Sequence, residues 1–315
     1  MLSIIVMVLP IFVLVFAGFL FSRLNFFGPT FASEFNRFVV YLALPALLFD
    51  IMANATWTDL YQPGFIATFT LSCAIIYALG IFIRLSSAQH LADASIDGLS
   101  AAYANTGYIG FPLCLLVFGK QSMPAVTIAA VITTSVLFAA AIIVIELSLQ
   151  PERNMHRLIA KVGRALVRNP LLISPVAGGL FAASGLSMPA GGETFFKILG
   201  GAASPCALVA LGAFLAQRRG EEEADHFGPL LLTAIKLLLQ PALTWLLAYE
   251  VFSLPQKLAE VAILLAALPT GTGPFMLAEL YKRGTLATSN TVLQSTILGM
   301  ITLSAFLFLS RYGTS

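Results

Sequence analysis

Charged side chains are scarce in this sequence. Asp, Glu, Lys and Arg together make up 10% of its 315 residues, whereas a soluble domain carries roughly 25%. Hydrophobic residues account for 58%, so too few polar side chains are present to cover a surface in contact with water. This composition excludes an ordinary soluble enzyme. The lack of a basic domain also argues against a nucleic-acid partner.

Residues for metal binding, covalent catalysis and disulfides are also few. The three histidines all fall in polar connectors, and none has the spacing of metal ligands. The three cysteines, Cys73, Cys114 and Cys206, lie inside apolar runs, which favours small buried side chains over a disulfide framework. The apolar runs contain no HExxH motif and no paired carboxylates. We therefore expect no catalytic residue, metal or cofactor, and we do not expect an enzyme.

Long apolar runs dominate what the sequence does contain. A membrane-spanning helix needs roughly 20 apolar residues, and ten candidate runs follow one another along the chain. The first has no basic residue before it and is followed by Arg23, which indicates a membrane span rather than a signal peptide. The predicted spans are Leu2–Ser22, Phe35–Ala53, Pro63–Ile83, Asp97–Phe118, Met123–Ser148, Pro170–Ser187, Thr194–Ala216, Gly228–Glu250, Lys257–Tyr281 and Leu286–Ser310. The predicted fold class is an all-α integral membrane protein with ten transmembrane helices.

The positions of the basic residues predict an orientation. Of the 17 Lys and Arg residues, twelve fall in connectors after odd-numbered spans and four in the other connectors or at the C-terminus. Cytoplasmic connectors carry such an excess of basic residues. We therefore expect both termini on the outer, periplasmic side of the plasma (inner) membrane. The basic segment 149–169 is predicted to be a cytoplasmic linker with a preference for anionic membrane lipid.

The two halves of the chain resemble each other. Ala43-Leu44-Pro45-Ala46-Leu47 in the second span matches Ala203-Ser204-Pro205-Cys206-Ala207 in the seventh. The fourth and ninth spans each carry a Gly- and Pro-rich stretch, at Asn105–Pro112 and Leu268–Phe275. Because each half has five spans, the second half must insert upside down. We predict a first five-helix repeat over 1–148 and a second, inverted repeat over 170–315, as in many secondary transporters.

Glycine and proline in mid-span predict broken helices and a binding site. Proline removes a backbone donor, and nearby glycines lower the cost of leaving helical geometry. We expect the second half-helices to begin near the two prolines and to present N–H groups to an anion. Two ordinary proline kinks are the alternative. The predicted substrate-binding residues are Asn105, Thr106, Gly107, Gly110, Pro112, Pro269, Thr270, Gly271, Thr272, Gly273 and Pro274.

Two ionisable residues inside spans are candidate coupling or charge partners. Lys236 lies about two turns into the eighth span, where its side chain could extend back to the cytoplasmic side or neutralise a carboxylate. Asp50 ends the second span, and we expect it to be solvated. The broken stretches contain no Asp or Glu, so Na⁺ is not favoured as coupling ion. The sequence leaves H⁺, Na⁺ and no coupling ion open.

Three motifs resemble those of the auxin efflux carrier family, which includes plant auxin exporters and bacterial carriers for malate or malonate. They are Asn36–Phe49 in the second span, the Asn-x-Gly-x-x-Gly-x-Pro run Asn105–Pro112, and Leu268–Ala278 in the ninth. The resemblance implies ten helices with crossed, broken fourth and ninth helices. It also implies a scaffold domain of the first, second, sixth and seventh helices, and an elevator-like transport domain. The chain lacks the long central loop of many plant members and is similar to the compact bacterial kind.

The expected function is that of a secondary transporter for small mono- or dicarboxylates such as malate or malonate, working by elevator-type alternating access. A Na⁺-coupled organic anion symporter with a fold like that of the bile acid symporters is the alternative. An anion channel and a non-transporting membrane receptor are further rivals, because neither is separated from a carrier by composition. A homodimer is compatible with the sequence.

Overall fold

The computed structural model describes residues 2–54, 61–86, 90–149, 164, 167–217 and 227–312. All regular elements in these ranges are helices, which confirms the all-α prediction. Most of the predicted linker, 149–169, lies outside the described residues. The helices of the first half are α1 Leu2–Arg23, α2 Phe31–Phe38, η1 Val39–Ala43, α3 Leu44–Ala53, α5 Pro63–Ser86, α6 Leu91–Ala102, η2 Thr106–Gly110, α7 Phe111–Phe118, η3 Lys120–Ser122, α8 Met123–Val131, η4 Ile132–Leu137 and α9 Phe138–Leu149.

Each of the ten predicted spans falls on helical structure. The helices of the second half are α11 Pro170–Ala183, α12 Ala190–Gly201, α13 Ala203–Gln217, α14 Phe227–Ala234, η5 Ile235–Leu239, α15 Gln240–Leu246, η6 Leu247–Val251, α16 Gln256–Ala266, α17 Gly273–Tyr281 and α18 Thr285–Tyr312. The largest shift in a boundary is in the fourth span, where α6 begins at Leu91 and not at the predicted Asp97.

Six helical stretches in the described ranges are long and apolar enough to cross a membrane: Phe31–Ala53, Pro63–Ser86, Lys120–Leu149, Ala190–Ala216, Phe227–Val251 and Thr285–Leu307. The fourth and ninth predicted spans are absent from this set because each is interrupted. With η2 counted together with α7, their half-helices have 9 to 13 residues, or about 14–20 Å of helix, and none alone spans a hydrocarbon core of about 30 Å. Val13–Arg23 and Pro170–Ala183 are shorter apolar helices.

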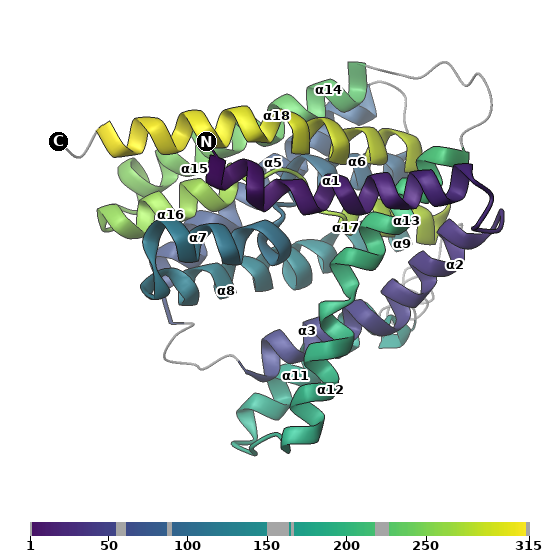
Figure 1. The fold of residues 1–315 in the computed structure, drawn as a ribbon. Helices are drawn as coiled ribbons and strands as arrows, with labels where there is room; N and C mark the ends of the chain where they lie inside the picture. The colour runs from purple at the N-terminus through teal and green to yellow at the C-terminus, as the bar shows by residue number, and fades with distance from the viewer. Residues whose placement is uncertain are drawn as a thin grey trace.

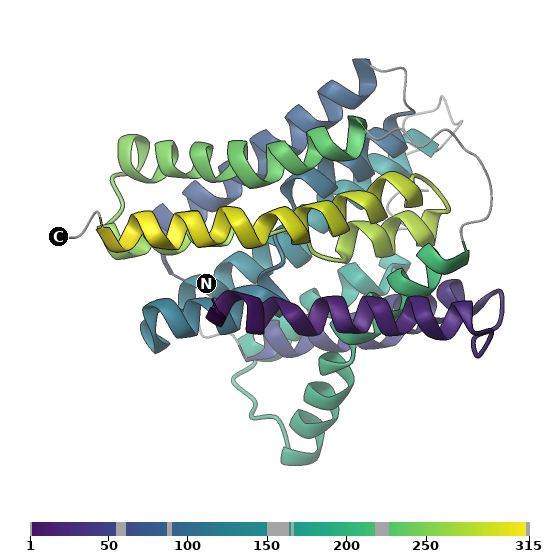
Figure 2. The same cartoon turned by 45° about the horizontal axis from the view of Figure 1, so that its top comes forward.

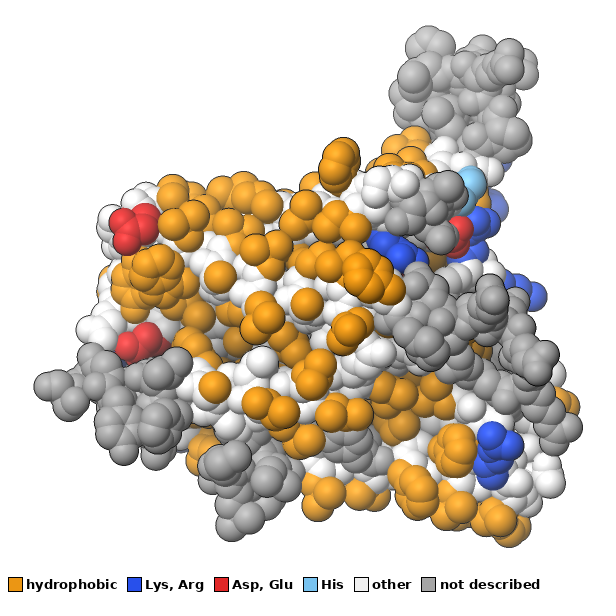
Figure 3. Space-filling view, turned by 90° about the horizontal axis from the view of Figure 1, so that it is seen from above, with side chains coloured by type: hydrophobic (Ala, Val, Ile, Leu, Met, Phe, Trp, Pro, Cys, Tyr) orange, Lys and Arg blue, Asp and Glu red, His pale blue; other side chains and the backbone are white. Residues whose placement is uncertain are grey.

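Large apolar side chains cover much of the outside, and several polar side chains are buried in an otherwise apolar interior. Phe16, Phe82 and Ile301 are 61–72% exposed, whereas Lys236 and Thr270 are fully buried. Figure 3 shows a broad hydrophobic surface across one face, with Lys and Arg side chains gathered toward one end. Such a distribution suits a protein whose solvent is lipid, because hydrocarbon cannot satisfy polar groups.

The helices form two groups. The smaller group contains α1, α2–α3, α11 and α12–α13, in which α1 packs along α13 and α3 packs against α11 and α12. The remaining helices form the larger group, where α6 packs against α5 and α9, and α14 packs against α18. Figure 1 and Figure 2 show α11 and α12 projecting from one side of the main body. This grouping separates the first, second, sixth and seventh predicted spans from the other six.

Glycines allow the backbones of the smaller group to touch. A Cβ atom added to Gly18 of α1 would lie 2.1 Å from the carbonyl oxygen of Val209, and one added to Gly212 of α13 would lie 1.9 Å from that of Val15. Small residues at helix contacts provide this close approach in membranes, where association depends on packing and not on the hydrophobic effect.

Several prolines follow a widened helical turn. The π-helical stretches η1, η2 and η5 each end two residues before a proline, at Pro45, Pro112 and Pro241. Because proline lacks an N–H group and its ring collides with the preceding turn, a local widening lets the helix continue past it. These prolines therefore reshape the helix without ending it.

Candidate functional site

The two interrupted spans cross at their breaks. The fourth span leaves helical geometry at Tyr103 and the ninth at Ala267. Ala104 and Thr270 form an isolated antiparallel bridge. The Asn105 N–H donates to the Pro269 carbonyl at 2.9 Å, and the Gly271 N–H donates to the Tyr103 carbonyl at 3.1 Å. The breaks therefore satisfy each other's backbone groups, which could not remain unpaired in hydrocarbon. We call these two stretches, 103–105 and 267–272, the crossover.

The half-helix that follows each break begins at a different distance from its proline. In the ninth span, α17 begins at Gly273, next to Pro274, as predicted. In the fourth span, the α-helix α7 begins at Phe111, next to Pro112, as predicted, but the π-helical turn η2 leads into it, so that helical structure starts earlier, at Thr106. The proline lies inside this half-helix, which tolerates it through the widened turn of η2.

Buried hydroxyl groups close the remaining backbone positions at the crossover. The Thr270 hydroxyl donates to the Ser100 carbonyl of α6 at 2.8 Å, and the Thr270 N–H donates to the Ser295 hydroxyl of α18 at 3.0 Å. The hydroxyls of Thr106 and Thr133 are 3.0 Å apart. Since the two contacts of Thr270 pair backbone groups, and the contact of Thr106 with Thr133 joins side chains, the crossover is supported from the larger helix group.

A cavity of about 150 Å³ lies beside the crossover, between the two helix groups. The smaller group contributes residues of α3 and of the α12–α13 junction, and the larger group contributes the crossover, η2 and one residue of η4. The lining residues are Leu44, Leu47, Gly200, Gly201, Ala203 and Ser204 on one side, and Tyr103, Ala104, Asn105, Thr106, Gly107, Thr134, Gly271, Thr272 and Met276 on the other. We call this cavity the crossover pocket.

Five of the eleven predicted site residues line the crossover pocket: Asn105, Thr106, Gly107, Gly271 and Thr272. Of the other six, Gly110, Pro269, Thr270, Gly273 and Pro274 lie in the crossover or in the half-helices that follow it and do not line the pocket, and Pro112 lies further along, in α7. Thr270 in particular is fully buried, and its hydroxyl group donates its hydrogen bond to a backbone carbonyl. Its position is that of a structural residue.

Two half-helices direct their N-terminal ends toward the pocket. Gly107 lies in the first turn of η2, and Thr272 is the N-cap residue of α17. The Thr272 side chain makes no capping hydrogen bond. Because the first N–H groups of a helix lack partners within the helix and carry a partial positive charge, this side of the pocket suits an anion.

The side chain of Lys236 extends toward the crossover and not toward the cytoplasmic surface. Its Nζ donates to the Ala266 carbonyl at 2.6 Å and to Gln240 Oε1 at 2.7 Å. Gln240 in turn donates through Nε2 to the Ala102 carbonyl at 3.1 Å. Of the two alternatives that the sequence left open for Lys236, extension back to the cytoplasmic side is therefore wrong. It does not line the pocket, but lies at the ends of α6 and α16 that border the crossover.

Asp50 lies away from the crossover. It is in α3, where its carboxylate accepts a hydrogen bond from Asn54 at 2.8 Å, and its side chain is partly exposed. This agrees with the expectation of a solvated group. Sequence reasoning missed Thr133 as a support, and Gly200, Gly201 and Ser204 as pocket residues. The last of these belongs to Ala203–Ala207, the stretch whose match to the second span already marked it.

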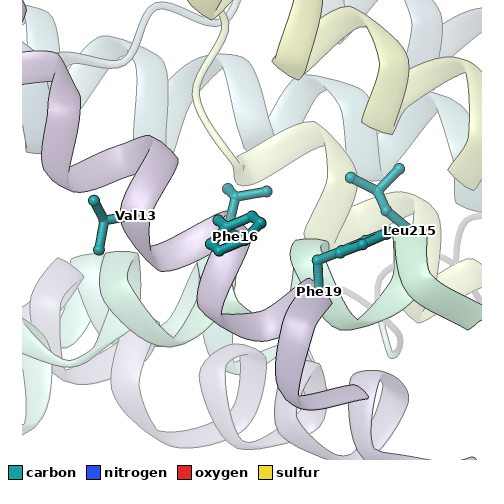
Figure 4. A pocket seen from close by; sticks show the side chains of 5 residues that line it. Val13, Phe16, Phe19 and Leu215 are labelled. Carbon is teal, nitrogen blue, oxygen red and sulfur yellow. The ribbon is translucent and has the colours of Figure 1, made fainter. Parts of the chain in front are cut away.

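Two other cavities differ from the crossover pocket in their lining and position. A groove of about 460 Å³ between α1 and α13 is lined by the hydrocarbon side chains Val13, Val15, Phe16, Phe19 and Leu215 (Figure 4). It offers no polar contact to an anion. A cavity of about 280 Å³ lies one turn beyond the crossover pocket along the second and ninth spans, lined by residues that include Val40, Tyr41, Leu280 and Arg168.

A crossing of two broken helices beside a pocket between two helix groups is an arrangement suited to a membrane carrier. The family described as "Membrane transport protein" matches residues 3–307, and the chain belongs to this family. The sequence resemblance to auxin efflux carriers is thereby confirmed, and the chain is an integral membrane protein of a transporter family.

Its relatives include proteins named as carriers in bacteria and plants. The chain is 30% identical to "Putative malonate transporter" of Rhizobium meliloti (strain 1021), over 98% of this chain and 96% of the relative. It is 25% identical to "Uncharacterized transporter YfdV" of Escherichia coli (strain K12), over 96% of each. It is 22% identical to "Auxin efflux carrier component 8" of Arabidopsis thaliana, over 95% of each.

Proposed function

We propose that this protein is a secondary transporter for small carboxylates, with malonate or malate as the first candidates, and that it binds them in the crossover pocket. The observation that carries the proposal is the pocket itself. It is small, it lies between two helix groups, and it is bordered by Asn105, Thr272 and the positive ends of two half-helices. The name of the bacterial relative supports a dicarboxylate.

The polar groups of the pocket match the chemistry of a carboxylate. The amide of Asn105 and the hydroxyl of Thr272 can donate hydrogen bonds, as can backbone N–H groups at Gly107. Each hydrogen bond to a charged group contributes about 1.5–3 kcal/mol. Two or three such bonds suffice for a carrier, which must bind its substrate and also release it.

The grouping of the helices favours an elevator motion, in which the larger group carries the crossover past the smaller one. Asn36 of α2 donates to the Met276 carbonyl of α17 at 3.2 Å, and is one of few polar links between the groups in the described residues. The cavity bordered by Arg168 continues from the crossover pocket along the same two helices. We infer that this cavity belongs to the path between the pocket and the cytoplasm. The ten spans then form two inverted repeats whose broken members share one site.

A Na⁺-coupled symporter is the second candidate, and the surroundings of the crossover disfavour it. Among the described residues, no group of three or more His, Cys, Asp or Glu side chains is placed to hold a metal ion. Lys236 already occupies the position where the two half-helices present their carbonyl ends. A cation there would meet a positive charge.

Uptake into proteoliposomes tests the proposal. We expect purified protein to take up labelled malonate with saturable kinetics, and to show counterflow when the vesicles are loaded with unlabelled malonate. Counterflow is a property of carriers, so saturable flux without it would indicate a channel. If mono- and dicarboxylates neither bind nor cross while neutral or cationic solutes do, the proposed function is wrong.

A further inference from the structure

The breaks in the fourth and ninth spans create four helix ends at the crossover. The N-terminal ends of η2–α7 and α17 border the pocket. The C-terminal ends of α6 and α16 point their last carbonyl groups the other way, into the larger helix group. Each helix end carries roughly half an elementary charge, positive at the N-terminus and negative at the C-terminus. Taken alone, the four ends cancel, and the crossover has little net attraction for an anion.

One pair of side chains serves both C-terminal ends. Lys236 donates to the carbonyl of Ala266, the last residue of α16, at 2.6 Å. Gln240, one turn later, donates to the carbonyl of Ala102, the last residue of α6, at 3.1 Å. The two side chains are joined by a hydrogen bond of 2.7 Å. Both are fully buried, so water does not screen the ammonium group.

We propose that Lys236 takes the place of a bound cation at the crossover. The two C-terminal ends together amount to about one negative charge, which one ammonium group offsets. The positive N-terminal ends that border the pocket are then left unopposed, and the carboxylate binds there without Na⁺. Lys236 is a positioning residue, since it acts through the helix ends and does not touch the substrate.

The surroundings of Lys236 support a cation in this place. In the described part of the chain, no Asp or Glu side chain is hydrogen-bonded to it, and it donates to two neutral oxygens, those of Gln240 and the Ala266 carbonyl. A carbonyl and an amide oxygen are also ligands that a small metal cation prefers. The inference rests on the proposed carrier function for its effect on the anion. Its effect on the fold can be measured separately.

Thermal unfolding of the purified full-length protein tests the cation role without a substrate. Lys236→Ala removes the ammonium and leaves space, so we expect a lower unfolding temperature that methylammonium or Na⁺ partly restores. The unfolding temperature of the wild type should be the same in methylammonium or Na⁺ as in a bulky organic cation that is too large to enter the site. Gln240→Met should also destabilise the protein, because the Ala102 carbonyl loses its donor, but small cations should not restore it. Lys257→Ala, which removes an exposed lysine, is the matched control.

Malonate binding tests the effect on the anion. We expect wild-type affinity to be the same with and without Na⁺, and Lys236→Met, which keeps the apolar volume, to bind malonate about tenfold more weakly or worse. Methylammonium should restore malonate binding by Lys236→Ala. Wild-type affinity in Lys236→Met, or a Na⁺ requirement in the wild type, overturns the inference and leaves the carrier function standing. If the wild type binds no carboxylate, the proposed function fails, and the unfolding measurement still decides whether Lys236 stands in for a cation.

Discussion

Gly107 gives the crossover pocket part of its space. A Cβ atom added there would meet no protein atom within 4 Å, and the residue lines the pocket in the first turn of η2. An alanine methyl group would therefore enter the cavity and not the protein core. In a helix, alanine is also more stable than glycine by roughly 0.5–1 kcal/mol. Binding and stability should thus change in opposite directions.

Gly107→Ala is expected to weaken carboxylate binding without destabilising the protein. One extra methyl group in a fitted pocket costs about 1–3 kcal/mol, and the loss should be larger for bulkier carboxylates than for malonate. Competition binding against labelled malonate measures it, alongside thermal unfolding. Gly191→Ala, also in open space but in the first turn of α12, is the control. Equal affinities in the two variants would place the substrate outside this pocket.

At the residue scale, the sequence predicted the pocket residues that belong to local motifs and missed those brought in by distant contacts. Asn105 and Thr272 could be predicted from the sequence, because nearby glycines and prolines are enough to indicate a helix break. The partners of Lys236 and Gln240 are 30 and 138 residues away. Lipid-facing and interior positions are equally apolar in this chain, so no periodicity revealed which way Lys236 points.

At the scale of elements, the crossing depends on glycines that face an aromatic ring. A Cβ atom on Gly273 would lie 2.6 Å from Cζ of Tyr103, and one on Gly271 would lie 2.9 Å from its Cε1. The Tyr103 ring is buried and packs edge-on against Phe138, with ring centroids 5.9 Å apart. The ring cannot move away freely. The backbone at the start of α17 can therefore come this close to the ring only at positions occupied by glycine.

Gly273→Ala is expected to destabilise the crossing by about 1–3 kcal/mol through overpacking, and to weaken malonate binding. Replacing the ring in the double variant Gly273→Ala/Tyr103→Leu should recover much of the loss, because the colliding atoms are gone. Thermal unfolding and malonate affinity of the two single variants and the double variant measure this coupling. If the losses of stability and affinity in the two single variants simply add up in the double variant, the alanine methyl group and the Tyr103 ring do not collide.

The breaks were predictable as elements, but their extent was not. Two glycines and a proline mark each stretch, and both spans are interrupted there. The sequence alone placed the start of the fourth span's second half-helix at Pro112, six residues later than Thr106. Proline is compatible with a π-helical turn as well as with a helix start. Only the contact with the ninth span decides between them.

At the scale of the whole molecule, the distribution of basic residues predicts an orientation that the fold alone does not reveal. We expect Asn154, in the basic central segment, to be cytoplasmic and Ser187, in the connector after α11, to face the periplasm. Single cysteines at these positions, in a background in which Cys73, Cys114 and Cys206 are replaced by alanine, should react accordingly with an impermeant maleimide added to intact cells. Labelling of Asn154→Cys from outside would reverse the proposed topology.

The rigidity of the smaller helix group is a further whole-molecule expectation. Because Gly18 and Gly212 bring the α1 and α13 backbones into contact, Gly18→Leu should separate these helices and destabilise the protein by about 1–3 kcal/mol or more. The crossover residues that line the pocket belong to other helices, and the lining residues of α13, Ala203 and Ser204, lie at its N-terminal end, before the contact with Gly18 at Val209. Thermal unfolding of Gly18→Leu should therefore show a lower unfolding temperature. The fraction of this variant that is folded should bind malonate with wild-type affinity. An unchanged unfolding temperature would contradict the close contact.

The central claim is that the crossover pocket binds a carboxylate, and the affinity of Asn105→Ala for malonate tests it most directly. Asn105 borders the pocket at the break of the fourth span, where its amide can donate to a carboxylate. Losing one hydrogen bond to a charged group costs about 1.5–3 kcal/mol, or roughly one to two decades of affinity. Asn54→Ala, which removes an exposed amide in the smaller helix group, is the control and should bind as the wild type does. Wild-type affinity in Asn105→Ala, at equal amounts of folded protein, would show that the crossover is a structural kink and that the substrate binds elsewhere.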